Sequence, residues 1–255
     1  MSVTTSLDGH VGSITLNRPD RMNAITVDLA RALRDAIESL GSDPEVNVIV
    51  IRGSGGNFCA GGDFEEVQRL RAEGPAALTE LFVSFREGCD AIAGVEVPVI
   101  AAVEGVAAAG GFELMQAADI VVVSDDARIA DNHINFGMIP GGGSTARLPR
   151  LVGRQQALGL LLSGDRISGL DAVRLGLAYR AFAPTEFDDG VLTFVERLAA
   201  RSREAVTTIT RLVRCGLDGP LSAALDAELA AVVDHIAGQA GTSGVAAFQN
   251  REVRT

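Results

Sequence analysis

Residues 99–119 have the sequence VIAAVEGVAAAGGFELMQAAD, and this stretch decides the fold of the chain. The apolar run after Pro98 predicts a buried strand, a loop of Ala and Gly follows, and residues 112–118 predict a helix with Glu113 in its first turn. Small residues let another molecule approach the backbone, and the first N–H groups of a helix have no partner within it. The stretch therefore offers a polarising N–H near Gly110 and a carboxylate three residues later. On these residues alone, an ordinary Gly-rich turn between strand and helix fits equally well.

Composition limits the class of protein. The chain has 255 residues, enough for one large domain or one and a half, and 47% of them are hydrophobic. Its net charge of −11 argues against general affinity for nucleic acid or for an anionic membrane surface. All 22 basic residues are Arg. The lack of Lys in the sequence excludes a Schiff-base or pyridoxal-phosphate lysine and a Walker-type phosphate lysine.

Cysteine usage and the first residues indicate a compartment. Cys59, Cys89 and Cys215 are odd in number and far apart, which fits a reducing compartment and gives no metal-ligand spacing. The first twelve residues have no basic-then-apolar signal pattern, and no run of about 18 apolar residues predicts a membrane span. We therefore expect a cytoplasmic protein without a membrane or nucleic-acid partner.

Strands alternate with helices over the first two thirds of the chain, which predicts an α/β domain with mainly parallel strands. A hairpin is expected around Asp8-Gly9, and Thr26 has the character of a helix N-cap. Further buried strands are expected at residues 46–51 and 119–123. After a loop-rich segment at 127–148, the chain is expected to be helical at residues 154–163, 168–176, 185–201, 203–215 and 220–237, with a short apolar piece at 177–182.

A second turn of small residues, FCAGGD at 58–63, also precedes a predicted helix. Its Cys59 has two interpretations, a nucleophile or a thiol of the core or cavity wall. The second is favoured because no His or Asn is placed in the sequence to pair with it. Three other motifs fail: Gly53 to Gly56 lacks the last Gly of a dinucleotide fingerprint, residues 140–144 lack the Lys of a P-loop, and residues 142–146 do not form a G-x-S-x-G elbow.

Six motifs, taken in order, resemble the crotonase, or enoyl-CoA hydratase/isomerase, superfamily over almost the whole chain. They are NRPDRMNA (17–24), FCAGGDF (58–64), PVIAAVEGVAAAGGFELMQAADI (98–120), GMIPGGGSTARLPRLVG (137–153), LLSGDRISGLDAVRLGL (161–177) and SGVAAF (243–248). The resemblance implies an α/β fold with a repeated ββα spiral core, assigned to residues 1–198, and a C-terminal helical oligomerisation or lid region, assigned to 199–255. It also implies homotrimers or dimers of trimers and acyl-CoA thioester substrates. No metal and no cofactor is implied beyond the coenzyme A carried by the substrate.

The same resemblance implies an oxyanion hole made by the backbone N–H groups of Ala60 and Gly110. Hydratases of the family usually carry two glutamates around a water, and one of them matches Glu113. Where the second is expected, this chain has His133. Three interpretations of His133 stay open, namely a catalytic acid or base, a group of the substrate pocket wall, and a structural hydrogen-bonding residue; Asp131 and Asn135 are candidates to orient it.

Contacts with coenzyme A are expected near residues 18–24 and 58–63. The residues assigned to them are Arg21, Ala24, Ala60, Asp63 and Phe248. An ordinary surface charge is the alternative interpretation of Arg21. The C-terminal segment QNREVRT is short and free of lysine, so Phe248 and Arg251 are the remaining candidates for a contact with a neighbour's coenzyme A.

The expected activity is that of an enzyme, a hydro-lyase that adds water across the double bond of a 2-enoyl-CoA. Glu113 is expected to activate the water, and His133 to position it or to supply the Cα proton. One alternative is an isomerase, for which Glu113 alone is enough, or a lyase or hydrolase that acts on a specialised CoA thioester. The other is an acyl-CoA-binding protein without activity.

Overall fold

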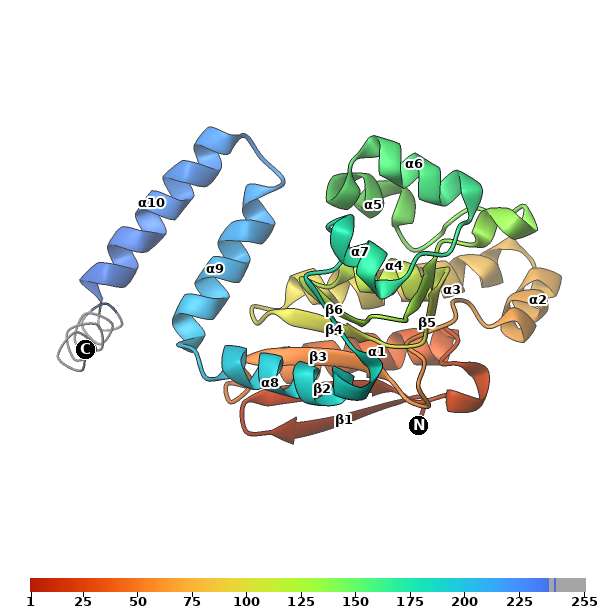
Figure 1. Cartoon of the computed structure of the whole chain (residues 1–255), viewed down its shortest axis with the longest axis horizontal. Coiled ribbons are helices and arrows are strands. Elements are labelled where there is room, and N and C mark those ends of the chain that lie inside the picture. The colour runs from red at the N-terminus through yellow and green to blue at the C-terminus, as the bar shows by residue number, and fades with distance from the viewer. Residues whose placement is uncertain (239–240, 242–255) are drawn as a thin grey trace. The chain divides into compact units, whose positions relative to one another are not determined.

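The computed structural model describes residues 1–238 and 241 (Figure 1). The chain divides into two compact units, Met1–Ala200 and Arg201–Thr255. Among the described residues, no helix combines the length and the hydropathy that crossing a membrane requires.

The first unit is built on a six-stranded sheet of order β1-β2-β3-β4-β6-β8. Its strands are β1 (Val3–Asp8), β2 (Val11–Leu16), β3 (Val48–Gly53), β4 (Val99–Val103), β6 (Ile120–Ser124) and β8 (Arg180–Phe182). The first two strands form the predicted antiparallel hairpin, and every later neighbour pairs in parallel. A second sheet pairs β5 (Val106–Ala108) with β7 (Arg128–Ala130). The expected α/β fold and its repeated ββα pattern are therefore confirmed, since β4 and β6 are each followed by a strand of the small sheet.

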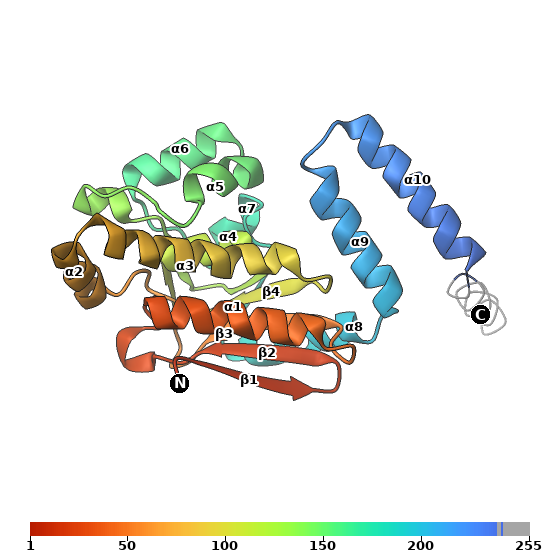
Figure 2. The same ribbon diagram turned by 180° about the vertical axis from the view of Figure 1, so that it is seen from behind.

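Helices cover both faces of the large sheet (Figures 1 and 2). The helices of this unit are α1 (Val27–Ser42), α2 (Phe64–Glu73), α3 (Pro75–Gly94), α4 (Gly110–Ala117), α5 (Ser144–Val152), α6 (Arg154–Ser163), α7 (Gly169–Arg174) and α8 (Phe187–Ala199), with short 3-10 helices η1 (Pro19–Arg21), η2 (His133–Phe136) and η3 (Pro184–Glu186). Thr26 caps α1 as predicted, because its side chain accepts the Leu29 N–H at 3.1 Å. Alternation along β3 explains the layers: Ile49 and Ile51 belong to the core on the α1 side, whereas Val48 and Val50 pack in the cluster that contains α8.

Two of the short strands were not expected from the sequence. The Ala-rich segment after Glu104 was predicted as a loop, yet it contains β5, and the segment at 127–148 contains β7 and most of α5. Strands of three residues, rich in Ala and without clear alternation, give no periodic signal. Their pairing is decided by neighbours distant in the sequence, since β5 pairs with β7 and Ala107 also forms a bridge with Cys59.

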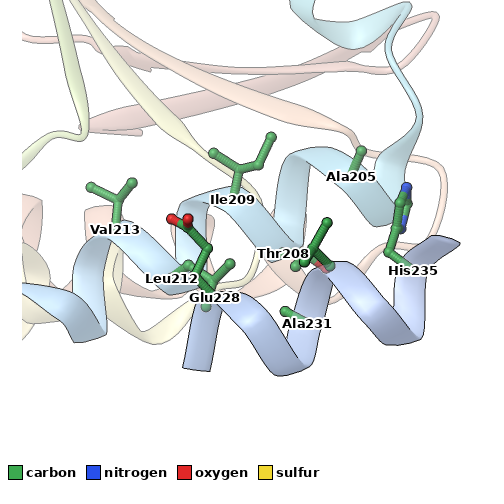
Figure 3. Close-up of a pocket in the computed structure, with 9 residues that line it drawn as sticks. Ala205, Thr208, Ile209, Leu212, Val213, Glu228, Ala231 and His235 are labelled. Carbon is green, nitrogen blue, oxygen red and sulfur yellow. The ribbon is translucent and has the colours of Figure 1, made fainter. Parts of the chain in front are cut away.

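The second unit contains α9 (Arg203–Gly216) and α10 (Leu221–Ala237). A groove of about 410 Å³ lies between them, and its walls are mostly apolar (Figure 3). Both helices also expose large hydrophobic side chains: Ile209, Val213, Leu225, Leu229, Val233 and Ile236. The oligomerisation or lid role expected of this region stays a prediction, and Phe248 and Arg251 lie outside the described residues.

The turn at residues 58–62 and the β5–α4 segment pack backbone against backbone. Cys59 N–H donates to the Val106 carbonyl at 2.9 Å, and Ala108 N–H donates to the Cys59 carbonyl at 3.0 Å. A side chain at Gly111 has no room here, because its Cβ atom would lie 2.0 Å from the Cys59 oxygen. Glycine at this position therefore lets the two segments touch.

Gly111→Ala is expected to destabilise the fold by about 3 kcal/mol or more, because the clashing atom belongs to the backbone and the segments must separate. The matched control is Gly159→Ala in α6, where an added Cβ meets nothing within 4 Å. That change is expected to stabilise the protein by about 0.5–1 kcal/mol through helix propensity. Urea unfolding measures both, and equal stability of the two variants would show that the close approach at Gly111 is not required.

Candidate active site

A cavity of about 520 Å³ opens in the first unit beside the two small-residue turns. Residues from α2, α3, α4, η2 and the segment after η2 form its walls. Its apolar lining comes chiefly from Ile25, Phe64, Val67, Leu81, Phe82, Phe85, Phe136, Met138 and Ile139. Its polar and backbone lining includes Ala60, Gly62, Gln68, Arg71, Gly110, Glu113, Asn132 and His133. The structure thus gathers Ala60, Gly110, Glu113 and His133, all predicted from the sequence, at one cavity.

The backbone N–H groups at this cavity are not equally free. Ala60 N–H donates to the Met22 carbonyl at 3.0 Å, so it has no hydrogen left for a ligand. Among the residues that the structure describes, the N–H groups of Gly62 and Gly110 have no acceptor. Gly110 is the first residue of α4, where an N–H has no partner in the helix. The Ala60 N–H that the resemblance implies for the oxyanion hole is therefore occupied in this structure, whereas Gly62, two residues further along the same turn, has an N–H without an acceptor among the described residues.

Glu113 is buried in the first turn of α4, with only 2% of its surface exposed. Its Oε1 atom accepts the Gly142 N–H at 2.7 Å and the Ser144 N–H at 3.1 Å, at the N-terminus of α5. No described residue donates a hydrogen bond to its Oε2 atom, and this atom is not among the fully buried atoms without a partner. Burial raises the pKa of Glu113 more than the Ser144 and Gly142 N–H groups and the charge of His133 lower it. One carboxylate oxygen is therefore anchored and the other is left for chemistry.

A glycine loop delivers these two N–H groups to Glu113. The Gly142 Cβ position lies 2.2 Å from the Phe85 ring, and the Gly141 position lies 2.6 Å from the Phe82 ring, so side chains have no room at either residue. Arg147 fixes the loop from outside, because its guanidinium donates to the Gly142 carbonyl at 2.7 Å. The sequence GGGS indicates only that this segment is no P-loop. The segment can hold Glu113 only because α4 and α5 are adjacent in the fold.

His133 begins η2 and is held from behind by a carboxylate. Its Nδ1 atom lies 2.6 Å from Asp131 Oδ1, and Asp131 is 1% exposed. Burial lowers the pKa of His133, but the hydrogen bond and charge of Asp131, with the charge of Glu113, outweigh it and raise that pKa. Asn135 does not orient His133, since its amide donates to the Gly164 carbonyl at 3.3 Å. Cys59 is fully buried, and burial raises the pKa of its thiol to about 12, which fits the core thiol and not the nucleophile.

Of the described residues assigned to coenzyme A, Ala60 lies in the cavity lining, whereas Arg21, Ala24 and Asp63 lie outside it. Arg21 pairs with Glu65 through two hydrogen bonds of 2.9 and 3.0 Å. Asp63 is buried, caps α2 by accepting the Glu66 N–H, and forms an ion pair of 2.8 Å with Arg18. Ala24 is buried, and its carbonyl accepts a hydrogen bond from Arg18. In this structure the Arg18–Asp63 ion pair therefore ties the 17–24 loop to the 58–63 turn, and the Ala24 carbonyl holds Arg18 within its loop.

Comparisons with known proteins show the family to which the chain is similar. A family model described as enoyl-CoA hydratase/isomerase matches residues 7–253. A probable enoyl-CoA hydratase of Rhizobium meliloti is 34% identical over 94% of this chain and 91% of its own length. A peroxisomal Δ(3,5)-Δ(2,4)-dienoyl-CoA isomerase of Arabidopsis thaliana is 32% identical over 80% of this chain and 77% of its own length. A crystal structure of an enoyl-CoA hydratase from Polaromonas sp. JS666 has a TM-score of 0.93 at 31% identity and covers 98% of this chain and 97% of that one.

Replacing the buried carboxylate should stabilise the protein in a pH-dependent way. Because the pKa of Glu113 is raised on folding, the folded state binds more protons above the ordinary pKa of Glu, and stability is lost as the pH rises through the raised value. Glu113→Gln keeps an oxygen for the Gly142 and Ser144 donors and removes this loss. Its thermal midpoint is expected to exceed that of the wild type at pH 8, by about 2–4 °C for each kcal/mol, and the difference should vanish near pH 4. A lower midpoint at pH 8 would contradict the prediction, and calorimetry measures it.

Proposed function

The chain belongs to the enoyl-CoA hydratase/isomerase family, and we propose that it adds water across the double bond of a 2-enoyl-CoA. One observation carries this proposal. Glu113 and His133, two groups able to transfer protons, line the same cavity as the free N–H groups of Gly62 and Gly110. Hydration needs both kinds of group, since a hydroxide must reach Cβ, a proton must reach Cα, and the thioester oxygen must carry charge in between.

In this mechanism the thioester carbonyl accepts hydrogen bonds from Gly62 and Gly110. Both donors are fixed by the fold, because the 58–62 turn and the β5–α4 segment are joined by backbone hydrogen bonds. They stabilise the enolate oxygen without having to reorganise as charge develops. Removing one such donor from an enzyme costs a factor of about 10² to 10³ in rate.

The water lies between Glu113 and His133. Glu113 Oε2 accepts a proton from it while the water oxygen bonds to Cβ of the substrate. The electrons of the double bond move to the thioester oxygen, and Cα then takes up a proton. The anchored Oε1 atom keeps the carboxylate in one orientation, since two backbone N–H groups hold it. Arg21 is retained as a contact for a coenzyme A phosphate, which has to compete with Glu65 for the guanidinium.

Isomerisation of a double bond is the second candidate activity. It is favoured by the dienoyl-CoA isomerase of Arabidopsis thaliana among the relatives and by the anchored carboxylate of Glu113, because a single base can move a proton between two carbons. In isomerisation no solvent oxygen enters the product, which separates it from hydration.

The proposal is tested by mixing crotonyl-CoA with the purified protein and following the absorbance of the conjugated thioester. Glu113→Gln is expected to lower kcat by a factor of about 10² to 10⁴, and His133→Ala to lower it by at least about 10². The matched controls are Glu87→Gln, a surface residue paired with Arg34, and His10→Ala, an exposed residue that bonds the Glu45 carbonyl. Both controls should retain wild-type rates.

Reaction in ¹⁸O-labelled water identifies the chemistry. Hydration is expected to place one labelled oxygen at Cβ of the product. Turnover of a β,γ-enoyl-CoA without incorporation of label would favour the isomerase. Measurable binding of crotonyl-CoA without any change in absorbance would contradict hydration of a simple enoyl-CoA.

A further inference from the structure

Asp131 is a buried carboxylate with one hydrogen-bond partner among the described residues. Its Oδ1 atom faces Nδ1 of His133 at 2.6 Å, and Oδ2 is buried without a hydrogen bond in the described part of the chain. An unpaired buried oxygen costs free energy that a structural residue usually avoids. Asp131 is also absent from the cavity lining, so it reaches a substrate only through His133.

The hydrogen bond to Asp131 decides which ring nitrogen of His133 carries a proton and which one is left for the cavity. An ionised carboxylate can only accept, so Nδ1 of His133 must donate to Asp131. The other ring nitrogen, Nε2, is then the atom left for the cavity that His133 lines. It donates if the ring is charged and accepts if the ring is neutral.

The surrounding charges favour the imidazolium ion. Asp131 lies directly behind the ring, and the charge of Glu113 also acts on it. Two neighbouring cations do not face the ring: Arg147 is bound to Gly142 and Asp90, and Arg154 of α6 is exposed; the groups whose charge acts on His133 are Asp131 and Glu113. Arg71 of α2 lines the cavity with an exposed side chain. Two carboxylates therefore act on one partly exposed ring.

We propose that Asp131 is a positioning residue that holds His133 as a cation with its Nε2–H directed into the cavity, so that His133 gives a proton to Cα while Glu113 takes one from water. The inference rests on the proposed hydration. It assigns one role to Glu113 and another to His133. The presence of both residues at one cavity does not by itself decide these roles.

The protons balance over one turnover. Glu113 gains a proton from water as the hydroxyl bonds to Cβ, and His133 loses its Nε2 proton as the new C–H bond forms at Cα. Afterwards Glu113 is neutral and His133 is neutral. Transfer of one proton from Glu113 to His133, directly or through a water, restores the starting charges.

Asp131→Asn separates the charge from the hydrogen bond, because the amide oxygen can still accept from Nδ1 and the size is nearly unchanged. The pH dependence of kcat is measured with crotonyl-CoA. The alkaline limb, where His133 loses its proton, is expected to move to lower pH, and kcat at pH 8 to fall by at least about tenfold with little change in KM. The control is Asp165→Asn, an exposed carboxylate, which should leave the profile unchanged.

A purely structural role for Asp131 gives a different result. Partial misfolding would lower kcat by the same factor at every pH and leave both limbs of the profile in place. That outcome would overturn the proposal.

Nuclear magnetic resonance of the imidazole ring tests the pairing without substrate. His133 signals are identified by their loss in His133→Gln. In the wild type, an exchange-protected downfield Nδ1 proton is expected, and this readout needs no folded Asp131 variant. In Asp131→Asn, the midpoint of the His133 titration should fall to lower pH.

The two measurements distinguish failure of the inference from failure of the proposed function. Turnover of crotonyl-CoA with an unmoved alkaline limb and an unmoved His133 midpoint would overturn the role of Asp131 and leave hydration standing. A downfield Nδ1 proton and a shifted midpoint without any turnover would support the pairing and contradict hydration of crotonyl-CoA.

Discussion

The contact between the 58–62 turn and β5 is the constraint on which the site depends. Cys59 exchanges hydrogen bonds with Val106 and Ala108, so two segments some fifty residues apart in the sequence run side by side. Each segment then enters a helix, α2 or α4, and each leaves at the same cavity an N–H that no described residue accepts. Glycine at position 111 is required by this approach, because its α-carbon faces the Cys59 carbonyl. The requirement for small residues is thus a packing requirement that also produces a pair of free donors.

The same arrangement places costly groups in the interior. Glu113 is almost completely buried, and only one of its oxygens is compensated by N–H donors. One oxygen of Asp131 has no hydrogen-bond partner in the part of the chain that the structure describes, and burial opposes the charged ring of His133. Stability alone would favour neutral or apolar side chains at these places. The proposed proton transfer requires charged groups there, so function and stability conflict in this region under the proposed mechanism.

A histidine at the position where the resemblance implies a second glutamate changes how the proposed second proton-transfer group must be supported. A carboxylic acid donates its proton from a single side chain, whereas an imidazole needs its remote nitrogen fixed before the near one can donate in a defined direction. Asp131 supplies that support from two residues away, on the short segment between β7 and η2. In the proposed mechanism, Asp131, His133 and Glu113 therefore act where the family resemblance implies a pair of glutamates.

The sequence by itself determined the alternation of strands and helices, the hairpin, the cap at Thr26, and the presence of Glu113 at a helix start, because these depend on local periodicity and turn chemistry. It also indicated the family through motifs in register. The three-residue strands β5 and β7 carried no such signal. Only the tertiary structure decided that Gly62 and not Ala60 has the free N–H, since the Met22 carbonyl that occupies Ala60 comes from a distant loop. It likewise decided that Gly142 and Ser144 anchor Glu113, because hydrogen bonds between residues far apart in the chain form only once α4 and α5 are packed together.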